Sequence, residues 1–103
     1  MLVVNRFRAS GVLDFGHELE TARDALSQCV GFQDGQVARN LDEPDLWCLV
    51  TRWADVGSYR RALSSYQVKL NVVPLLSRAL DEPSAYEIAG AEPFNVQLPR
   101  ELH

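Results

Sequence analysis

A chain of 103 residues is long enough for one domain and too short for two. Hydrophobic residues make up 47% of the chain and charged residues 23%, which excludes a disordered or collagen-like protein. The 10 basic and 14 acidic residues give a formal net charge of −4, whereas nucleic-acid-binding proteins normally carry a basic stripe. The composition predicts a soluble globular domain that binds no nucleic acid.

The cysteines and the N-terminus favour the cytoplasm. Cys29 and Cys48 are the only two cysteines and form no CxxC pair, as is typical of reduced thiols. The apolar run at Leu2 to Val4 is too short for a signal peptide, and no stretch reaches the ~20 apolar residues of a membrane span. We therefore expect a cytoplasmic protein without membrane association.

The first strand is predicted from Val3 to Arg8, where apolar and polar residues alternate. A helix follows, because apolar residues recur at steps of three and four on one stripe. The stripe consists of Phe15, Leu19, Ala22, Leu26 and Cys29. Asp14 is the expected N-cap of this helix, and Gly31 stands where a C-terminal stop belongs.

Two further strands are predicted in the middle of the chain. Residues 32–41 are polar and contain Gly35, so they indicate a weak strand at a sheet edge. After a turn at residues 42–45, the segment 46–53 is the strongest strand pattern. One of its faces carries Trp47, Leu49, Thr51 and Trp53.

A second helical region is expected from about Asp55, and Pro74 must interrupt or restart it. One side of that helix carries Tyr59, Ala62, Leu63 and Tyr66. Arg60 and Arg61 are interpreted as its solvated face. Residues 84–89 indicate a last strand, so that a domain spans residues 1–90 and a tail without periodicity spans 91–103.

The order β-α-β-β-α-β predicts an α+β, ferredoxin-like fold with an antiparallel sheet and both helices on one face. The other face carries Val4, Cys48 and Val50, which should not stay in contact with water. A second copy of the chain covers such a face most simply. We therefore expect a homodimer that forms an α+β barrel.

Several segments together resemble a known family. They are Val4-Asn5-Arg6, Gly31-Phe32, the strand 45–53, and Tyr59-Arg60-Arg61-Ala62-Leu63. Over residues 2–90 these segments are similar to the antibiotic biosynthesis monooxygenase domain, a family of small dimeric α+β barrels. Its members include cofactor-independent oxygenases acting on polyketide-type phenols and enzymes that degrade haem.

The resemblance implies a cofactor-independent monooxygenase with a small aromatic, phenolic or quinol-like substrate. Asn5 matches a family asparagine that faces the pocket, so it is the candidate catalytic residue. Its amide would donate to a developing oxyanion. The alternative interpretation is that Asn5 is a buried amide with a purely structural role.

The candidate substrate-binding residues are the aromatic side chains Trp53, Trp47, Tyr59 and Tyr66. They could stack against a flat substrate, or they could be large core residues and helix anchors.

Haem degradation is disfavoured. The haem-degrading members carry a tryptophan where this chain has Ala62, and a histidine where it has Asn71 or Val72. The only histidines are His17, on the predicted solvent side of the first helix, and His103 in the tail. Neither the cysteines nor the histidines have metal-ligand spacing, so no metal is expected.

The alternative is a non-catalytic dimer that binds a small hydrophobic molecule or has a structural role. The scarcity of general bases favours this alternative. The polar Asn5 on an otherwise apolar strand face favours the enzyme.

Overall fold

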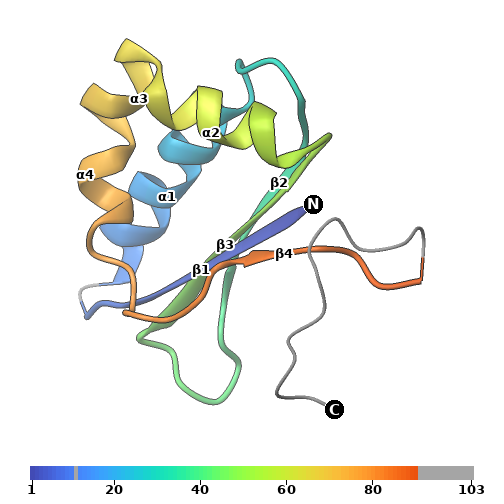
Figure 1. Ribbon diagram of the computed structural model, residues 1–103. Coiled ribbons are helices and arrows are strands. Elements are labelled where there is room, and N and C mark those ends of the chain that lie inside the picture. The colour runs from blue at the N-terminus through green and yellow to red at the C-terminus, as the bar shows by residue number, and fades with distance from the viewer. Residues whose placement is uncertain (11, 91–103) are drawn as a thin grey trace.

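The computed structural model describes residues 1–10 and 12–90 and contains a four-stranded antiparallel sheet (Figure 1). The strands are β1 (Leu2–Arg8), β2 (Phe32–Arg39), β3 (Leu46–Trp53) and β4 (Ala85–Tyr86), in the order β2-β3-β1-β4. The helices are α1 (Val12–Leu26), α2 (Val56–Ser64), α3 (Tyr66–Asn71) and α4 (Val73–Leu76). The ferredoxin-like order is confirmed, with the second helical region divided into three pieces.

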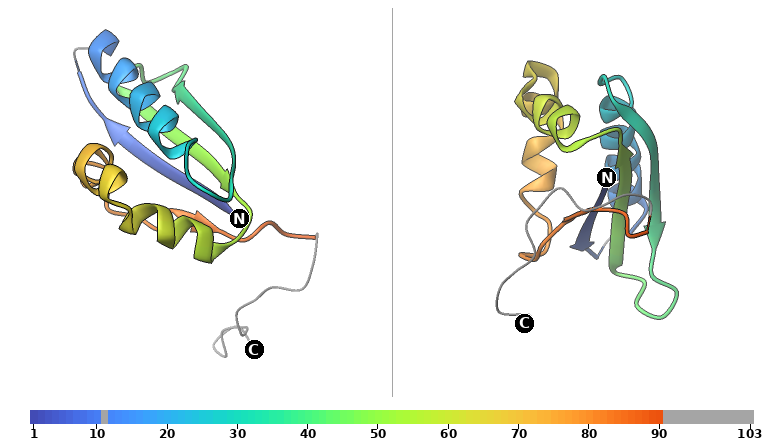
Figure 2. Two further views of the ribbon diagram at one scale, coloured as in Figure 1. Left: turned by 90° about the horizontal axis from the view of Figure 1, so that it is seen from above. Right: turned by 45° about the vertical axis from the view of Figure 1, so that its right-hand side comes forward.

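All helices lie on one face of the sheet (Figure 1). Seen from above in Figure 2, β1 runs between α1 on one side and α2 on the other. The two helical groups therefore flank the central strand that carries Asn5.

Helix α1 begins earlier than the sequence predicts. Its first residue is Val12, so Asp14 lies inside the first turn and is not the N-cap. A carboxylate in that turn still interacts favourably with the partial positive charge of the helix N-terminus. The helix also ends early, at Leu26, and a turn follows in which Cys29 donates its amide to the Leu26 carbonyl at 3.0 Å. Gly31, with φ of 90°, ends this turn and not the helix.

The start of α2 is confirmed. Asp55 is its N-cap, and the Asp55 carboxylate accepts the Ser58 amide at 2.7 Å. The predicted continuous stripe is wrong beyond Leu63, because Ser65 has the extended backbone angles −70° and 150° and starts a new helix. The break turns Tyr66 outward, where it is 78% exposed. Pro74 lies in the first turn of α4, which confirms that it restarts the helical region.

The last strand is shorter than predicted, with two residues instead of the segment 84–89. The preceding chain still follows the edge of β1, since Leu80 donates to the Arg6 carbonyl and Val4 donates to the Ser84 carbonyl. Pro83 between them has no amide hydrogen, so a continuous ladder cannot form there. The predicted tail, 91–103, lies outside the described residues.

The core lies between the sheet and the helices. Val3 and Phe7 of β1 and Leu49 and Trp53 of β3 point into it and are at most 1% exposed. Phe15, Leu19, Ala22 and Leu26 of α1 meet them from the helix side, as their spacing predicts. The free cysteines Cys29 and Cys48 lie on different sides of the sheet and are half-buried.

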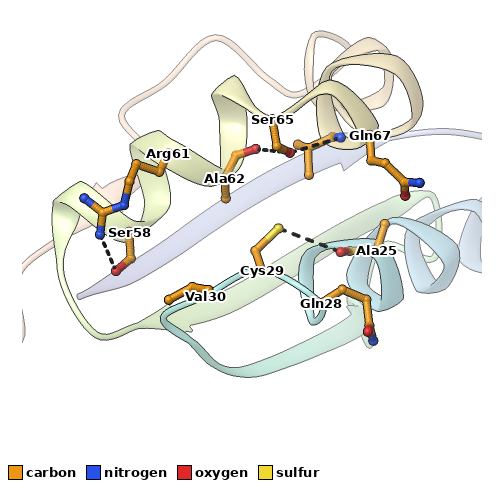
Figure 3. A pocket seen from close by; sticks show the side chains of 10 residues that line it. Ala25, Gln28, Cys29, Val30, Ser58, Arg61, Ala62, Ser65 and Gln67 are labelled. Carbon is orange, nitrogen blue, oxygen red and sulfur yellow. Dashed lines mark hydrogen bonds between the residues drawn. The ribbon is translucent and has the colours of Figure 1, made fainter.

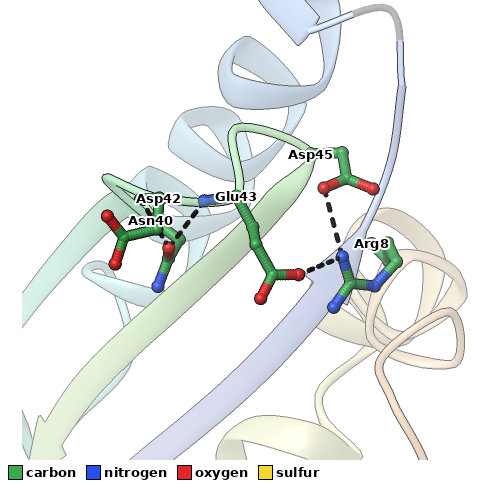
Figure 4. Close-up of polar contacts among 5 residues, drawn as sticks. All are labelled: Arg8, Asn40, Asp42, Glu43 and Asp45. Atoms are coloured by element: carbon green, nitrogen blue, oxygen red, sulfur yellow. Dashed lines mark hydrogen bonds and ion pairs between the residues drawn. The ribbon is translucent and has the colours of Figure 1, made fainter.

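The connection between β2 and β3 is tied to β1 by polar contacts (Figure 4). The Asn40 side chain accepts the amides of Asp42 and Glu43 at 2.9 and 2.8 Å. Arg8 pairs with Glu43 at 2.9 Å and with Asp45 at 3.1 Å. These bonds form the predicted turn and hold the hairpin against the end of β1.

In residues 1–10 and 12–90, no helix is long and apolar enough to cross a membrane.

Candidate functional site

Asn5 lies on the helix-covered face of β1 between the buried side chains of Val3 and Phe7, opposite Leu49 of β3. It is half-buried. Its side chain lies near the hydroxyl of Tyr59 on α2. Burial raises the pKa of Tyr59, and the polar interaction with Asn5 works in the opposite direction. The polar residue predicted on this strand thus joins the sheet to the second helical region.

Tyr59 also contacts Trp53, whose ring centroid is 5.4 Å from its own. Trp53 in turn meets Phe32 edge-on at 5.3 Å, and its indole nitrogen donates to the hydroxyl of Thr51 at 2.9 Å. Trp53 is fully buried, which agrees with the interpretation as a large core residue. Asn5, Tyr59 and Trp53 therefore form one contiguous cluster, which we call the strand cluster.

Trp47 lies apart from the strand cluster, near the other end of β3. Its ring packs edge-on against Phe15 at 6.2 Å, and the guanidinium of Arg39 lies 5.6 Å from its centroid. The benzo ring approaches α1 so closely that a Cβ on Gly16 would lie 2.8 Å from it. The Trp47 indole nitrogen is buried and has no hydrogen-bond partner among the described residues. Trp47 therefore braces α1 against the sheet.

Tyr66 is not brought together with the other predicted aromatic residues. Its exposed ring lies on α3, beyond the break at Ser65. Of the four aromatic residues predicted to bind a substrate, Trp53 and Tyr59 are in contact, whereas Trp47 and Tyr66 lie elsewhere.

A hollow of about 550 Å³ lies between the C-terminal end of α1 and the helices α2 and α3 (Figure 3). We call it the helix cleft. Its lining residues are Ala25, Gln28, Cys29, Val30, Ser58, Arg61, Ala62, Ser65, Gln67 and Val68. The volume falls within the ~300–1,000 Å³ that is usual for small-molecule sites. The walls are mainly apolar, with hydroxyl, amide and thiol groups among them.

The helix cleft depends on small residues. Ala62 is buried on α2, and its short side chain leaves space beside it. On the opposite wall, the turn at Gly31 packs so tightly on α2 that a Cβ there would lie 2.3 Å from Ser58. Close packing at Gly31 and a small side chain at Ala62 together shape the cleft.

Polar groups enter the cleft from both walls (Figure 3). On the α2 wall, Arg61 donates to the Ser58 hydroxyl at 3.3 Å. On the other wall, the Cys29 thiol lies 3.9 Å from the Ala25 carbonyl, and burial raises the pKa of that thiol. The neutral thiol is therefore the dominant form of Cys29 at neutral pH.

The sequence analysis missed Ser58, Arg61 and Cys29 as lining residues. Arg61 is interpreted from the sequence as a solvated helix residue, and it is exposed. The one signal in the sequence is Ala62, because a small residue among larger side chains on the apolar side of a helix leaves space beside it. Tyr59 is separated from this cleft and lines a second hollow of about 360 Å³ between α2 and β4. Asn5 lines neither of these hollows.

His17 is exposed on α1, as predicted. Within the described residues, no group of three or more histidine, cysteine or acidic side chains is placed to hold a metal ion. His103 lies outside that part of the chain.

Comparison with solved structures identifies several similar folds. A candidate antibiotic biosynthesis monooxygenase from Deinococcus radiodurans is 20% identical, with a TM-score of 0.69, over 94% of this chain and 99% of its own. A variant of SnoaB, a cofactor-independent oxygenase from Streptomyces nogalater, is 21% identical, with a TM-score of 0.67, over 77% and 82%. A conserved protein from Methanosarcina mazei Go1 is 24% identical, with a TM-score of 0.64, over 82% and 84%. At these identities the likeness establishes the fold.

No curated protein matches this chain. The sequence profile of the antibiotic biosynthesis monooxygenase family matches residues 2–70, from β1 to α3. This match spans more than half of the sequence and includes the strand cluster and every lining residue of the helix cleft. The chain belongs to the antibiotic biosynthesis monooxygenase family.

Proposed function

We propose that the protein is a cofactor-independent monooxygenase that oxidises a small phenolic or quinol-like aromatic substrate in the helix cleft. The observation that carries this proposal is the cleft itself, a hollow of about 550 Å³ with largely apolar walls in the segment that matches the family. Apolar walls with a few polar groups suit a flat aromatic molecule with one or two oxygen substituents.

The proposed reaction uses the substrate as its own electron source. A substrate of the anthrone type loses a proton to become an anion, and the anion transfers one electron to dioxygen. The resulting substrate radical and superoxide combine, forming a carbon–oxygen bond. After protonation of the peroxide, its oxygen–oxygen bond breaks with loss of water, and a carbonyl remains. The methylene group and dioxygen thus become a carbonyl group and water.

Asn5 is the proposed donor to the substrate anion. Asn5 does not line the helix cleft, so the oxygen-bearing end of the bound substrate must extend beyond the cleft toward β1. A side-chain amide has two N–H groups, so Asn5 can interact with Tyr59 through one and offer the other to an oxyanion. Its neighbours Val3 and Phe7 are almost fully buried, which holds the amide in place. A fixed donor in a water-poor environment stabilises developing charge more than the same group does in water.

A non-catalytic binding protein of the same fold is the second candidate. The observation that favours it is the chemistry of the strand cluster. Neither the cluster nor the neighbouring Thr51 has a group that accepts a proton readily at neutral pH. Burial raises the pKa of Tyr59, which makes that hydroxyl a still weaker acid. In this alternative, the helix cleft holds an aromatic ligand without converting it.

Dioxygen uptake over a panel of hydroxyanthrones and quinols distinguishes the two candidates. We expect at least one compound to be consumed with one dioxygen per quinone formed, measured against the spontaneous rate without protein. Binding without any uptake above that rate across the panel would reject the enzyme and favour the binding protein.

A variant that fills the helix cleft tests whether the reaction takes place there. Ala62→Leu adds bulk to the wall of the helix cleft, so turnover should fall severalfold or more, whereas Ala54→Leu adds the same bulk at an exposed position. Melting curves of both variants exclude loss of the fold. Equal turnover in the two variants would place the reaction outside the cleft.

We also propose that the protein acts as a homodimer, joined through the sheet face that carries no helix. Val4, Cys48 and Val50 lie side by side on that face in adjacent strands and are half-buried. A second copy would remove these side chains from water.

A further inference from the structure

Among the described residues that line the helix cleft, Arg61 has the one charged side chain. This is notable in a chain with 14 acidic residues and a net charge of −4. The other lining groups are hydroxyls, amides, a neutral thiol and apolar side chains, so the potential inside the cleft takes its sign from Arg61.

The guanidinium of Arg61 is only weakly engaged. Arg6, Arg8, Arg23 and Arg78 each form an ion pair with a carboxylate, whereas the described residues provide no such partner for Arg61. Its hydrogen bond to Ser58 is long, at 3.3 Å. A guanidinium has five N–H donors in a planar fork, so most of them remain to bind a ligand.

The nearest carboxylate on the same helix is already occupied. Asp55 accepts the Ser58 amide at 2.7 Å as the N-cap of α2 and does not line the cleft. Hydrogen bonds from Ser58 lower the pKa of Asp55 most, and the charge of Arg61 adds a smaller contribution. The cap thus holds the start of α2 in place without covering the side of Arg61 that faces the cleft.

Ser58 adds a second polar group beside Arg61. It is buried, and its hydroxyl accepts the bond from Arg61 and interacts with the Asp55 carboxylate, so it orients the guanidinium. Ala62, one turn further along α2, and Val68 on α3 continue this wall as an apolar surface. A molecule that matches this wall has an anionic group at one end and a flat apolar body.

We propose that the helix cleft selects aromatic substrates that carry a carboxylate, and that Arg61 is the residue that binds this carboxylate. The inference rests on the proposed function, because it assigns the substrate class of the same cleft. A planar carboxylate accepts two parallel bonds from a guanidinium, which a neutral phenol cannot do. Arg61 binds the substrate and takes no part in the oxidation.

A matched pair of ligands tests the inference independently of turnover. The probes are 1-hydroxy-2-naphthoic acid and its carboxamide, which have the same ring system and differ in charge. We expect the wild-type protein to bind the acid about tenfold or more tightly than the amide in a calorimetric titration. The preference should weaken as the salt concentration increases.

Two neighbouring arginines provide the variant and its control. Arg61→Gln should remove the preference for the acid while leaving amide binding nearly unchanged. Arg60→Gln removes the same charge from the same helix at a residue that lines the second hollow, so it should retain the preference. If both variants lose the preference for the acid equally, the effect is one of general charge and the role of Arg61 is overturned.

Cys29 locates the bound acid, because it lines the helix cleft. The acid should slow alkylation of Cys29 by N-ethylmaleimide, read by peptide mass spectrometry, in the wild type but not in Arg61→Gln. Equal alkylation of wild-type Cys29 with and without the acid would overturn the proposed location.

The outcome separates this inference from the proposed function. If the acid binds through Arg61 but no phenolic acid in an uptake panel consumes dioxygen, the inference holds and the oxygenase proposal fails. If neutral quinols are oxidised as readily as their carboxylated counterparts and Arg61→Gln changes neither rate, the inference fails and the oxygenase proposal stands.

Discussion

The two faces of the sheet have the same strands and opposite surroundings. On the face covered by helices, Val3, Phe7, Leu49 and Trp53 are almost completely removed from water. On the open face, the residues between them in sequence, such as Val4, Cys48 and Val50, are half-buried.

The difference shows how far a 103-residue chain can complete its own core. One helical layer covers one face, and no described helix lies over the other (Figure 2). Charged side chains surround the apolar centre of the open face. Among them, Arg6 pairs with Glu82, and Arg8 pairs with Glu43 and Asp45. An apolar centre within a charged rim is the usual anatomy of a protein interface.

Truncation in the core should have the largest effect. Trp53→Ala removes a fully buried ring together with its contacts to Phe32 and Tyr59, so we expect a loss of about 3–5 kcal/mol of unfolding free energy. Val50→Ala on the open face should cost about 1 kcal/mol or less. Urea unfolding of both variants at the same low protein concentration checks the contrast, and equal losses would contradict it.

Asn5 tests whether the polar residue on the covered face serves catalysis or structure. In the proposed oxygenase, Asn5→Ala should lower turnover by about 10²–10³-fold. Loss of the Asn5 amide should cost about 1–3 kcal/mol of stability at most.

Melting curves and initial rates, measured on one preparation and normalised to folded protein, separate the two roles of Asn5. Tyr59→Phe serves as the control, since it removes the hydroxyl that interacts with Asn5 but leaves the amide. Wild-type rates from a clearly destabilised Asn5→Ala protein would reject a catalytic role.

The open face should determine the oligomeric state. We expect a dimer at micromolar concentration in sedimentation equilibrium, and Val50→Asp should shift it to the 11.6 kDa monomer, because a charge would be buried in the interface. The matched change Leu70→Asp places the same charge on the exposed surface of α3, away from the open face, and should leave the dimer intact. A wild-type monomer at that concentration would contradict the proposed dimeric barrel.

The smallest effect concerns the rim of the open face. Glu82 forms two hydrogen bonds of 2.7 Å with Arg6, which lower the pKa of Glu82 below its usual 4.5. The stability from this pair is present above the usual carboxyl pKa and disappears as the pH falls through the lower folded value. Wild type should therefore lose slightly more stability than Glu82→Gln between about pH 5 and pH 3. Identical pH profiles would show that the pair contributes nothing measurable.

Much of the fold follows from local patterns. The segment 46–53 was predicted as a strand at the residues where β3 occurs, because alternation, β-branched residues and flanking turn residues all favour that structure. The cap at Asp55 and the restart at Pro74 follow from the backbone chemistry of single residues. The limits of α1 were less predictable, since a residue such as Asp14 suits the first turn as well as the cap.

For the candidate site, what the sequence determined and what the tertiary structure decided are more clearly separated than for the fold. The sequence by itself determined that Asn5 lies between two core residues on a strand and that the chain carries family motifs, because strand alternation and motif spacing are local properties. Only the tertiary structure decided that Asn5 lies near Tyr59, that Ser65 turns Tyr66 away, and that Cys29 and Arg61 line one cleft. These groups are distant in sequence, and their separation in space depends on how the helices pack across β1, which no local pattern specifies.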